Sequence, residues 1–555
     1  MKFSSKSMMS VFLVIVISLS VVGSVLANSI TGPSSSQTPY LVRSQPGVVI
    51  RSIFTVGDSA NFKPDGVTPY RMVGIPDGLG AYDNGDGTFT VLMNHEIGGG
   101  LSSGLVSPLG GARAHNNAGA FVSIWTISKE DLSVIKVEDF LANDYSIYLS
   151  NNNPSTGTVH TAYLSGDTTV IQRLCSADLA APGAYLYTAT DGTVYGTAAR
   201  IFQSGEESGG IASGFASGFS GDLGPEGTVH FGRQFAFIAT DDLNTPQNEA
   251  RTAYELPHGG LFAWENNLAN PYSQRKTIVM GMDDTSPGQI YVWVGDKQTT
   301  GNVVERAGLT RQSSNDNLYV IKVNGLATDA SGATNESRTT PLSGTFSLVN
   351  EGDVSGLTGA QLETLSDTKG GTQFLRPEDG QWDPNSPSDF YFVTTDRYNQ
   401  VKDGVGTQDG RSRLYRLRFT DITQPELGGT IEALLDGTEA GNMFDNITVN
   451  SRGQVLLQED PGNQVHLAKI FLYDIATDTL TQVASHDPAR FGDIGIPATA
   501  PFNVDEESSG IIDVSSILGE GWYLLDVQAH YAISGELVEG GQLLALHIPP
   551  GKKFK

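Results

Sequence analysis

The feature that most constrains this chain is a series of short strand-like segments that recurs along most of its length. Each segment alternates or clusters Val, Ile, Phe, Tyr and Leu and is bounded by Gly, Asp, Asn or Pro, a pattern typical of β-strands. The segments cover residues 88–93, 120–127, 260–265, 277–282, 289–294, 317–323, 390–394, 413–419, 454–458, 469–474, 479–484, 522–527 and 542–547. Helical periodicity is scarce, and one helix is expected at 357–366.

Many short antiparallel strands in one long chain favour a β-propeller, because its radial packing leaves only short, protected sheet edges. Turn signals agree with this: an Asn-Gly-Asp-Gly run at 84–87 precedes one segment, and Asp-Gly tolerates the positive φ of tight hairpins. No strict repeat of fixed period is visible. The expected fold class is therefore all-β, a degenerate β-propeller, with two stacked β-sandwich domains as the alternative.

The N-terminal residues have the pattern of a secretory signal peptide. Lys2 and Lys6 precede an apolar run at 11–22, and small residues follow near position 27. The run is short for a membrane span, although an uncleaved anchor is an alternative. We expect a signal peptide at 1–27, a flexible linker rich in Ser, Thr, Pro and Gln at 28–47, and a single propeller domain at 48–555. The mature protein is expected to be secreted or periplasmic, without a membrane anchor.

Charge and cysteine content narrow the classes of function. The chain has 61 acidic and 34 basic residues, a net charge of −27, which repels nucleic acid and excludes polynucleotide binding as a main function. The acidity serves either a solvated surface or the binding of cations. Cys175 is the one cysteine, so no internal disulfide can form, and stability must come from a large core or from bound metal.

Two polar features are candidates for a site. Glu96, in Asn94-His95-Glu96, directly follows a predicted strand and precedes three glycines, and functional side chains often lie where a strand passes into a loop; a turn with an incidental Glu is the alternative. Cys175 alone would most often be a small buried apolar residue. Acidic neighbours raise the pKa of a thiol and make it a poor nucleophile, whereas a bound transition metal deprotonates it.

Acidic clusters occur elsewhere in Gly- and Ser-rich surroundings. They are Glu206-Glu207, Glu226, and Asp505-Glu506-Glu507. Adjacent carboxylates repel each other unless they share a cation, and calcium takes six to eight oxygen ligands. None of the clusters matches the EF-hand loop, and a solvated loop is the alternative for each.

The stretch Arg376-Pro377-Glu378-Asp379 combines a guanidinium group with two carboxylates. The planar fork of donors in Arg fits phosphate oxygens, and a neighbouring Glu can bind metal. Without metal, the same residues would form an internal salt bridge. Asp445 and, after the next strand, Glu459-Asp460 repeat the placement of polar oxygens at strand ends.

Other common catalytic motifs are absent from the sequence. It has no Gly-x-Ser-x-Gly elbow, no His-Glu-x-x-His pair, no phosphate-binding loop ending in Gly-Lys-Ser or Gly-Lys-Thr, and no dinucleotide-binding glycine fingerprint. Nine histidines are scattered without ligand spacing. An oxygen-rich metal site is what remains.

The order of these motifs resembles that of the PhoX-type alkaline phosphatases. The matching features are Asn94-His95-Glu96, Cys175, Glu206-Glu207, the segment 260–265, Arg376-Pro377-Glu378 and Asp445-Asn446. The resemblance covers roughly residues 50 to 530. It implies a six-bladed propeller with iron and calcium ions at one end of its axis, and hydrolysis of phosphate monoesters outside the cytoplasm. The start of the chain lacks the arginine pair of the export signal common in that family.

The resemblance also implies roles for individual residues. Cys175 and one of Glu206 and Glu207 correspond to iron ligands, and Glu96 and Glu378 to further carboxylate ligands. Arg376 corresponds to the phosphate-binding arginine. The candidates for calcium ligands are Asp379, Asp445, Asp505 and Glu506.

The function expected from the sequence is that of a secreted, monomeric phosphatase that uses Ca2+ and Fe3+ to hydrolyse small phosphate monoesters. Two alternatives remain open at this point. One is another calcium-dependent esterase, such as a phytase, phosphodiesterase or lactonase, because propellers host several chemistries. The other is a non-enzymatic secreted propeller that binds calcium for stability.

Overall fold

The computed structural model describes residues 29–102, 105–114, 118–142, 147–150, 163–164, 170–208, 210–212, 229–242, 249–398, 412–552 and 554. The predicted signal peptide lies outside these residues. Among the helices that are described, none combines the length and apolar character needed to span a bilayer.

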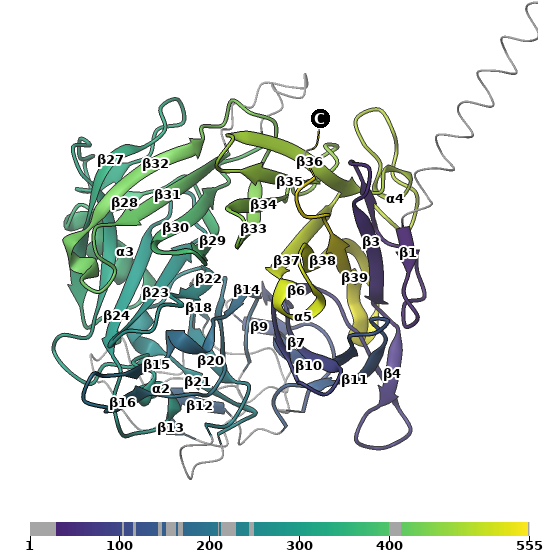
Figure 1. Cartoon of the computed structure of the whole chain (residues 1–555), viewed down its shortest axis with the longest axis horizontal. Coiled ribbons are helices and arrows are strands. Elements are labelled where there is room, and N and C mark those ends of the chain that lie inside the picture. The colour runs from purple at the N-terminus through teal and green to yellow at the C-terminus, as the bar shows by residue number, and fades with distance from the viewer. Residues whose placement is uncertain are drawn as a thin grey trace, which may run out of the picture.

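The described strands form six blades around one axis (Figure 1). Each blade begins with an innermost strand and runs outward through neighbours that are antiparallel except for two outer pairs, β21 with β12 and β3 with β1. The innermost strands are β6 (Pro76–Asp83), β14 (Leu174–Leu179), β22 (Trp264–Ala269), β29 (Pro377–Asp383), β33 (Phe444–Asn450) and β37 (Glu506–Asp513). Each contacts the innermost strand of the next blade, and β37 contacts β6, so the ring is closed.

The outer strands of each blade follow in order. Blade 1 continues with β7 (Thr88–His95), β10 (Phe121–Ser128) and β11 (Val134–Asp139), and blade 2 with β17 (Ile201–Glu206), β20 (Gln234–Ile238), β21 (Thr252–Glu255), β12 (Ile147–Ser150) and β13 (Tyr163–Leu164). Blade 3 continues with β23 (Lys276–Asp283), β24 (Ile290–Asp296) and β25 (Asn317–Val323), and blade 4 with β30 (Ser386–Thr394), β31 (Arg413–Phe419) and β32 (Gly429–Leu435). Blade 5 continues with β34 (Gln454–Glu459), β35 (Lys469–Asp474), β36 (Thr479–His486) and β2 (Leu41–Arg43), and blade 6 with β38 (Trp522–Ile533), β39 (Val538–His547), β3 (Val49–Thr55) and β1 (Ser29–Thr31).

The remaining elements join or decorate the blades. Strand β27 (Ser343–Gly352) pairs with both β25 and β32 and so fuses blades 3 and 4 into one sheet. The paired short strands are β4 (Ser59–Phe62) with β5 (Pro69–Arg71), β8 (Gly99–Ser102) with β9 (Leu105–Pro108), β15 (Leu186–Thr188) with β16 (Val194–Gly196), β18 (Gly210–Ala212) with β19 (Val229–Phe231), and β26 (Thr334–Asn335) with β28 (Thr372–Gln373). The short helices are α2 (Val303–Arg306), α3 (Gly359–Thr368), α4 (Pro488–Phe491) and α5 (Ser515–Leu518).

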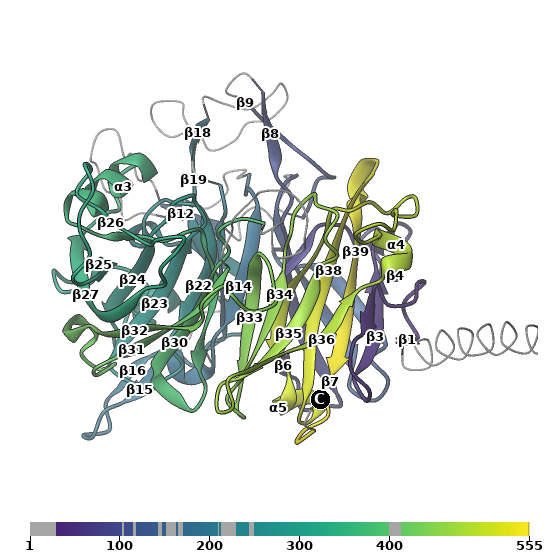
Figure 2. The same cartoon turned by 90° about the horizontal axis from the view of Figure 1, so that it is seen from above.

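The β8–β9 and β18–β19 hairpins rise above one end of the propeller, and α5 and the C-terminus lie at the other end (Figure 2). The prediction of an all-β, degenerate propeller with six blades is confirmed. The segment 260–265 is an exception among the predicted strands, because residues 260–263 are irregular and the strand begins only at Trp264. Helix α3 covers most of the helix expected at 357–366.

The ring is closed by the two ends of the described chain. N-terminal β3 pairs antiparallel with C-terminal β39, from Val49 opposite His547 to Thr55 opposite Gln542. The stretch 28–47, expected to be a flexible linker, differs from that expectation. It contributes β1 and β2 to two blades, and Tyr40 and Leu41 are buried between blades 5 and 6. Apolar side chains at these positions outweigh the Ser- and Pro-rich composition around them.

Side chains packed between neighbouring blades form the core. Buried clusters alternate around the axis with the blades, and the largest fully buried side chains include Trp125, Trp264 and Trp382. Strands β3 and β39 contribute Ile50 and Leu546 to the cluster between blades 5 and 6. The N-terminal strand is therefore a structural part of the propeller.

This closure predicts a large effect of a core substitution in β3. Ile50 is 0% exposed, so Ile50→Ala should lower the free energy of unfolding by about 2–5 kcal/mol, from lost burial and the cavity left behind. The matched control is Ile30→Ala in β1, where the side chain is 37% exposed and the cost should be under about 1 kcal/mol. Urea unfolding measures both; equal, small effects would contradict a role of β3 in closing the ring.

Candidate metal centre

One backbone irregularity recurs at the same place in five blades. In β6, Pro76 pairs with His95 of β7, but the next paired residue is Leu79 with Met93, so three steps on the innermost strand match two on its neighbour. The same bulge separates Leu174 from Ala177, Trp264 from Asn267, Pro377 from Gly380, and Phe444 from Ile447. A bulge bends a strand and redirects its side chains, and bulges are frequent next to active sites.

The first residue inside each bulge is acidic or a thiol. These residues are Asp77, Cys175, Glu265, Glu378 and Asp445, the second residue of their respective strands. In blade 6 the bulge comes later, between Ser509 and Ile512, and the second residue of β37 is Glu507. The six innermost strands therefore each bring one such group to the same end of the axis.

A second set of polar groups comes from the last residues of the second strand, or from the loop after it, in each blade. In each of the first five blades, the innermost residue just before the bulge pairs with a residue of the second strand, and the next residue of that second strand belongs to this set. The residues are Glu96 in blade 1, Glu207 in blade 2, Asp284 in blade 3, Thr395 in blade 4 and Asp460 in blade 5. In blade 6, His530 follows Ala529, which pairs with Glu506. These loops lie at the end of the propeller from which the β8–β9 and β18–β19 hairpins rise (Figure 2).

The two sets converge into three contiguous groups of potential ligands. Their donor atoms lie within 4.8 Å of one another in the groups Asp77–Glu96–Cys175, Cys175–Glu207–Glu265 and Glu265–Glu378–Asp445. All members are buried. Cys175 belongs to two of the groups and Glu265 to two, so the groups form one continuous centre.

Burial and mutual repulsion dominate the electrostatics of this centre. Burial, followed by the charges of neighbouring carboxylates, raises the pKa of Asp77, Glu378 and Asp445 well above the usual range. The same causes raise the pKa of Glu265 to about 8 and that of Glu507 to about 7. Too little positive charge surrounds these carboxyl groups for all of them to be ionised at once in a site removed from water.

The same two causes, burial and nearby carboxylates, act on the Cys175 thiol. Its Sγ donates a hydrogen bond to Oε2 of Glu265 at 3.1 Å. Burial and then the charge of Asp77 raise the pKa of the Cys175 thiol well above its usual value. A buried thiol among carboxylates is inert as a nucleophile unless a cation stabilises the thiolate.

Two arginines and a histidine carry positive charge at the rim. Arg173 contacts Glu96 at 2.5 Å and Glu207 at 2.6 Å. The charge of Glu96 raises the pKa of Arg173, and the charge of Arg173 lowers the pKa of Glu96 against the opposing effect of burial. Arg376 lies 2.8 Å from both Asp284 and Glu378. His530 bonds to Glu539 at 2.7 Å.

A hydrogen-bonded layer bridges the axis beneath the ligand groups. Asn446 of blade 5 donates to Ser176 Oγ of blade 2 at 2.6 Å and accepts a hydrogen bond from Gly510 N at 2.8 Å. Asn266 of blade 3 donates to Asp379 of blade 4 at 2.6 Å. Gly78 of this layer packs so closely on blade 2 that an added Cβ would lie 2.4 Å from the backbone nitrogen of Ala177. These contacts fix the strands that carry the ligands.

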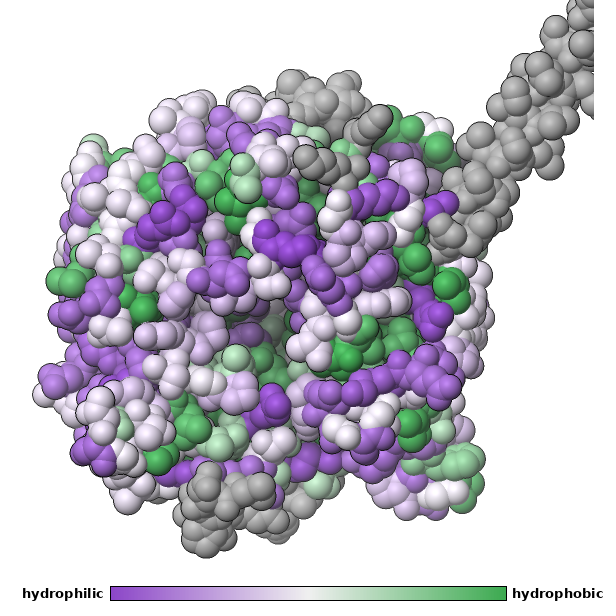
Figure 3. Space-filling view, viewed as in Figure 1, coloured by the Kyte–Doolittle hydropathy of each residue, from purple (hydrophilic) through white to green (hydrophobic). Residues whose placement is uncertain are grey.

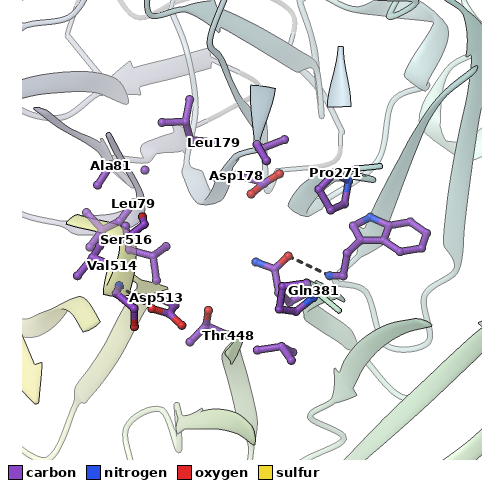
Figure 4. A pocket seen from close by; sticks show the side chains of 18 of the residues that line it. Leu79, Ala81, Asp178, Leu179, Pro271, Gln381, Thr448, Asp513, Val514 and Ser516 are labelled. Atoms are coloured by element: carbon purple, nitrogen blue, oxygen red, sulfur yellow. Dashed lines mark hydrogen bonds between the residues drawn. The ribbon is translucent and has the colours of Figure 1, made fainter. Parts of the chain in front are cut away.

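Below this layer a cavity of about 590 Å³ opens at the other end of the axis, lined by later residues of the innermost strands and by α5. Asp178, Gln381, Thr448 and Asp513 surround it (Figure 4). Figure 3 shows the hollow at the centre of this face. The hydrogen-bonded layer lies between this cavity and the ligand groups.

The donor atoms of the three groups are suited to cations of two kinds. The two groups that contain Cys175 combine sulfur with carboxylate oxygen, and thiolate ligands select transition metals. The group Glu265–Glu378–Asp445 offers oxygen alone, which suits hard cations such as calcium. The pKa values of the same carboxyls are raised because too little positive charge compensates them.

The structure brings together six of the residues selected from the sequence: Glu96, Cys175, Glu207, Glu378, Asp445 and Arg376. It places the other four outside the ligand groups. Glu206 is turned away and ion-paired with Arg233 at 2.7 Å, and Asp379 accepts hydrogen bonds from Asn266 and from the backbone nitrogens of Gly380 and Ile447 in the layer beneath.

Asp505 and Glu506 lie one blade edge away from the centre. Glu506 accepts a hydrogen bond from the backbone of Ala468 in blade 5 at 3.1 Å, and the backbone carbonyl of Asp505 accepts one from His530 N. Their neighbour Glu507 points to the other face of β37 and joins the centre, because successive side chains of a strand alternate. Glu226 lies outside the described residues.

Sequence reasoning did not name Asp77, Asp284, Arg173 or His530 as ligands or site residues. It noted Glu507 and Asp460 only within acidic clusters, and Glu265 only within the segment 260–265. A weak signal existed, because a bulky or Pro residue, an acid and a small or polar residue follow each other in Pro76-Asp77-Gly78, Trp264-Glu265-Asn266, Pro377-Glu378-Asp379 and Phe444-Asp445-Asn446. The spacing between these triplets is irregular, and only the bulge that they share identifies them as equivalent.

Comparison with known proteins finds similarity in structure alone. No family model and no curated protein matches the sequence. The fold is similar to that of Pseudomonas fluorescens PhoX, solved in complex with vanadate, a transition state analogue. The TM-score is 0.56 at 12% identity, over 94% of this chain and 97% of that chain. At this identity the likeness shows a shared PhoX-like fold.

More distant structural similarities are much weaker. A puromycin-hydrolysing peptidase of Mycobacterium tuberculosis and the NanB sialidase of Streptococcus pneumoniae are each 11% identical. They cover 82% and 89% of this chain, and the matches span 58% and 70% of theirs. The TM-scores of 0.27 and 0.28 are too low to support any conclusion.

The raised carboxyl pKa values predict how the metal-free protein responds to pH. A carboxyl whose pKa is higher in the folded than in the unfolded chain stabilises the fold below the unfolded value, and that stability is lost as pH rises through the folded value. For Glu265 this window runs from 4.5 to about 8. Chelator-treated protein should therefore melt at a lower temperature at pH 8.5 than at pH 6.

The acidic surface also lowers the melting temperature as pH rises. The variant Glu265→Gln separates the contribution of the Glu265 carboxyl from that of the surface. The neutral amide cannot ionise, so the decrease in melting temperature between pH 6 and pH 8.5 should be smaller than in the wild type. Differential scanning calorimetry on both proteins measures it. A wild-type melting temperature that rises with pH over this range would contradict the assignment.

Proposed function

We propose that this protein is a metal-dependent phosphatase that hydrolyses small phosphate monoesters. The observation that carries the proposal is the buried centre of carboxylates and one thiol, flanked by two arginines whose side chains reach the surface. Carboxylates gathered at this density call for cations, and arginine is the residue best suited to phosphoryl oxygens. The PhoX-like fold supports the same reading.

The cations of the proposal are iron and calcium. Cys175, with Asp77, Glu96, Glu207 and Glu265, would hold iron, and Glu265, Glu378 and Asp445 would hold calcium. Bound cations supply charge stabilisation to a phosphoryl group and an activated oxygen nucleophile. The buried Cys175 thiol, with its raised pKa, is assigned to metal binding and not to attack on the substrate.

Arg376 is proposed to bind the phosphoryl oxygens. Its Nε and Nη2 donate to Oδ1 and Oδ2 of Asp284 at 2.9 and 2.8 Å, which fixes the plane of the guanidinium group. Burial alone would lower its pKa, but the charges of Glu378 and Asp284 raise it above the usual value. The side chain is 27% exposed. A guanidinium group held in this way can bind an anion without reorganisation, which favours transition-state stabilisation.

One chain supplies all the side chains that this mechanism uses, so we propose that the monomer is the active unit. The proposed substrate is a small-molecule phosphoester, because the ligand groups are buried at the axis. Action outside the cytoplasm, in the periplasm or beyond the cell, agrees with the N-terminal sequence pattern.

The test is hydrolysis of p-nitrophenyl phosphate at alkaline pH by protein that carries calcium and iron. Activity should be lost on chelation and return when metal is restored. Arg376→Ala should lower kcat by about a hundredfold to a thousandfold, as for the loss of one charge-stabilising donor. The matched control is Arg418→Ala, since Arg418 also binds an aspartate with two hydrogen bonds, to Asp389, but lies in an outer strand.

Full turnover by Arg376→Ala would remove Arg376 from the mechanism. Metal-loaded wild-type protein that hydrolyses no phosphate monoester would refute the proposed function. A loss of activity equal in the Arg418→Ala variant would indicate a general folding defect instead of a specific role.

The role of Cys175 can be tested without an activity assay. Replacing the thiol by a hydroxyl removes the soft ligand, so Cys175→Ser should lower the iron content of purified protein. Calcium should remain, because Glu265, Glu378 and Asp445 are unchanged. Elemental analysis by mass spectrometry measures both ions. Unchanged iron in the Cys175→Ser variant would assign Cys175 to packing.

A further inference from the structure

A second arginine occupies in blade 2 the position that Arg376 occupies in blade 4. Arg173 and Arg376 each stand two residues before the ligand in the bulge, in Arg173-Leu174-Cys175 and Arg376-Pro377-Glu378. Both have positive φ, 37° and 59°, a region that residues other than glycine seldom adopt and that is enriched at functional sites. The repeated blade geometry thus places two guanidinium groups at equivalent points of one end of the propeller.

The two arginines are also anchored in the same way. Arg173 donates from Nε and Nη2 to Glu96 at 2.9 and 2.5 Å, and Arg376 donates from the same two atoms to Asp284. Glu96 and Asp284 are the equivalent loop residues of blades 1 and 3. Each arginine is therefore oriented by a carboxylate of the preceding blade, and this ion pair occurs at equivalent positions of the repeated blade structure.

In both side chains, one edge of the guanidinium group remains open. Among the described residues, no hydrogen bond or ion pair engages Nη1 of either arginine. The Arg173 side chain is 46% exposed and that of Arg376 is 27% exposed. A guanidinium group has five donors in a planar fork, so each can still bind an oxyanion from the solvent side.

The arginines lie on either side of the same ligands. Arg173 contacts Glu207, and Arg376 contacts Glu378. Glu207 and Glu378 each lie within 4.8 Å of Glu265, which comes from the blade between them. The innermost strand of blade 3 lies between those that follow the two arginines, so the two guanidinium groups approach the centre from different blades. With Arg376 bound to one phosphoryl group, Arg173 would remain for another anionic group.

We propose that Arg173 binds a second anionic group of the substrate, so that the enzyme prefers small phosphate monoesters that carry a further carboxylate or phosphate. This inference rests on the proposed phosphatase function. Glu96 and Glu207 would be neutralised by cations held at the centre, and the charge of Arg173 would then be available to an incoming anion. Arg376 binds the phosphoryl group that is cleaved, and Arg173 determines specificity.

The experiment compares two substrates that differ in one group. 3-Phosphoglycerate carries a carboxylate where glycerol 3-phosphate carries a neutral hydroxymethyl group. The metal-loaded wild type should show a higher kcat/KM for 3-phosphoglycerate. Arg173→Gln should reduce the ratio of the two kcat/KM values by about tenfold to a hundredfold, as for the loss of a charge-assisted hydrogen bond, mainly through KM for 3-phosphoglycerate.

Two further variants separate specificity from a structural role. Arg173→Lys keeps the charge without the planar fork, so it should retain part of the preference. Arg376→Gln should lower kcat/KM for both substrates and leave their ratio unchanged. Metal content is measured for every variant, because Arg173 also holds Glu96 and Glu207. If Arg173→Gln loses metal, the ratio in the metal-loaded Arg173→Lys variant decides, and a ratio equal to that of the wild type overturns the inference.

The inference fails separately from the proposed function. If Arg173→Gln lowers both rates by the same factor, or neither, Arg173 is not a specificity residue, although the phosphatase function stands. If the wild type hydrolyses neither compound, that function fails, and calorimetric binding decides the role of Arg173. Tighter binding of 3-phosphoglycerate that is lost in Arg173→Gln supports the second anion site, and equal binding of both compounds overturns it.

Discussion

At the axis of the propeller, carboxyl groups from all six blades lie close together and away from water. Donor atoms within one ligand group are separated by at most 4.8 Å, and two like charges at that distance repel by about 3–4 kcal/mol at an effective dielectric constant near 20. Several such pairs, together with the desolvation of each carboxylate, oppose folding. The protein must offset this energy with the packing between blades and with positive charge at the centre. The raised pKa values of Asp77, Glu265 and Asp445 express the same energy on a pH scale.

The fold meets this constraint through a repeated local device. Innermost strands of a propeller converge at the axis, and in five of the six blades a bulge at the second residue turns one side chain into the centre. The second residues inside three of the bulges, Asn446, Asn266 and Asp379, link blades through hydrogen bonds, so the ligand positions are fixed relative to one another. Buried carboxylates held rigidly in this way bind cations with little loss of conformational entropy, which is the usual requirement of a preorganised site.

The same repetition accounts for the arrangement of positive charge. Arg173 and Arg376 hold equivalent positions and are oriented by equivalent carboxylates, yet blade 5 has Met443 at this position, also with positive φ. The backbone conformation is thus common to three blades, and only two of them use it to present a guanidinium group. A pseudo-symmetric scaffold with asymmetric side chains can bind a small ligand in one orientation.

Much of the architecture was predictable from the sequence, because it depends on local patterns. Strands such as β25 and β31 have the bounds expected from their apolar alternation. The segment 260–265 is strand only from Trp264, because Pro257, Gly259 and Gly260 favour a turn before it. The N-terminal stretch was misjudged as well: its Ser and Pro content resembles a linker, and the burial of Tyr40 and Leu41 arises from contacts with strands more than 400 residues away.

The same distinction between local pattern and long-range contact applies to the residues of the candidate site. The sequence by itself determined an all-β chain with an acidic excess, one cysteine and acidic residues at strand ends, since these follow from composition and short-range pattern. Glu96, Cys175, Glu378, Asp445 and the pair Glu206-Glu207 could be selected without tertiary information. Only the tertiary structure decided which member of an acidic pair faces the axis, as with Glu207 over Glu206 and Glu507 over Glu506. Bulges and blade closure set the direction of each side chain, and these depend on strand pairing between residues far apart in the chain.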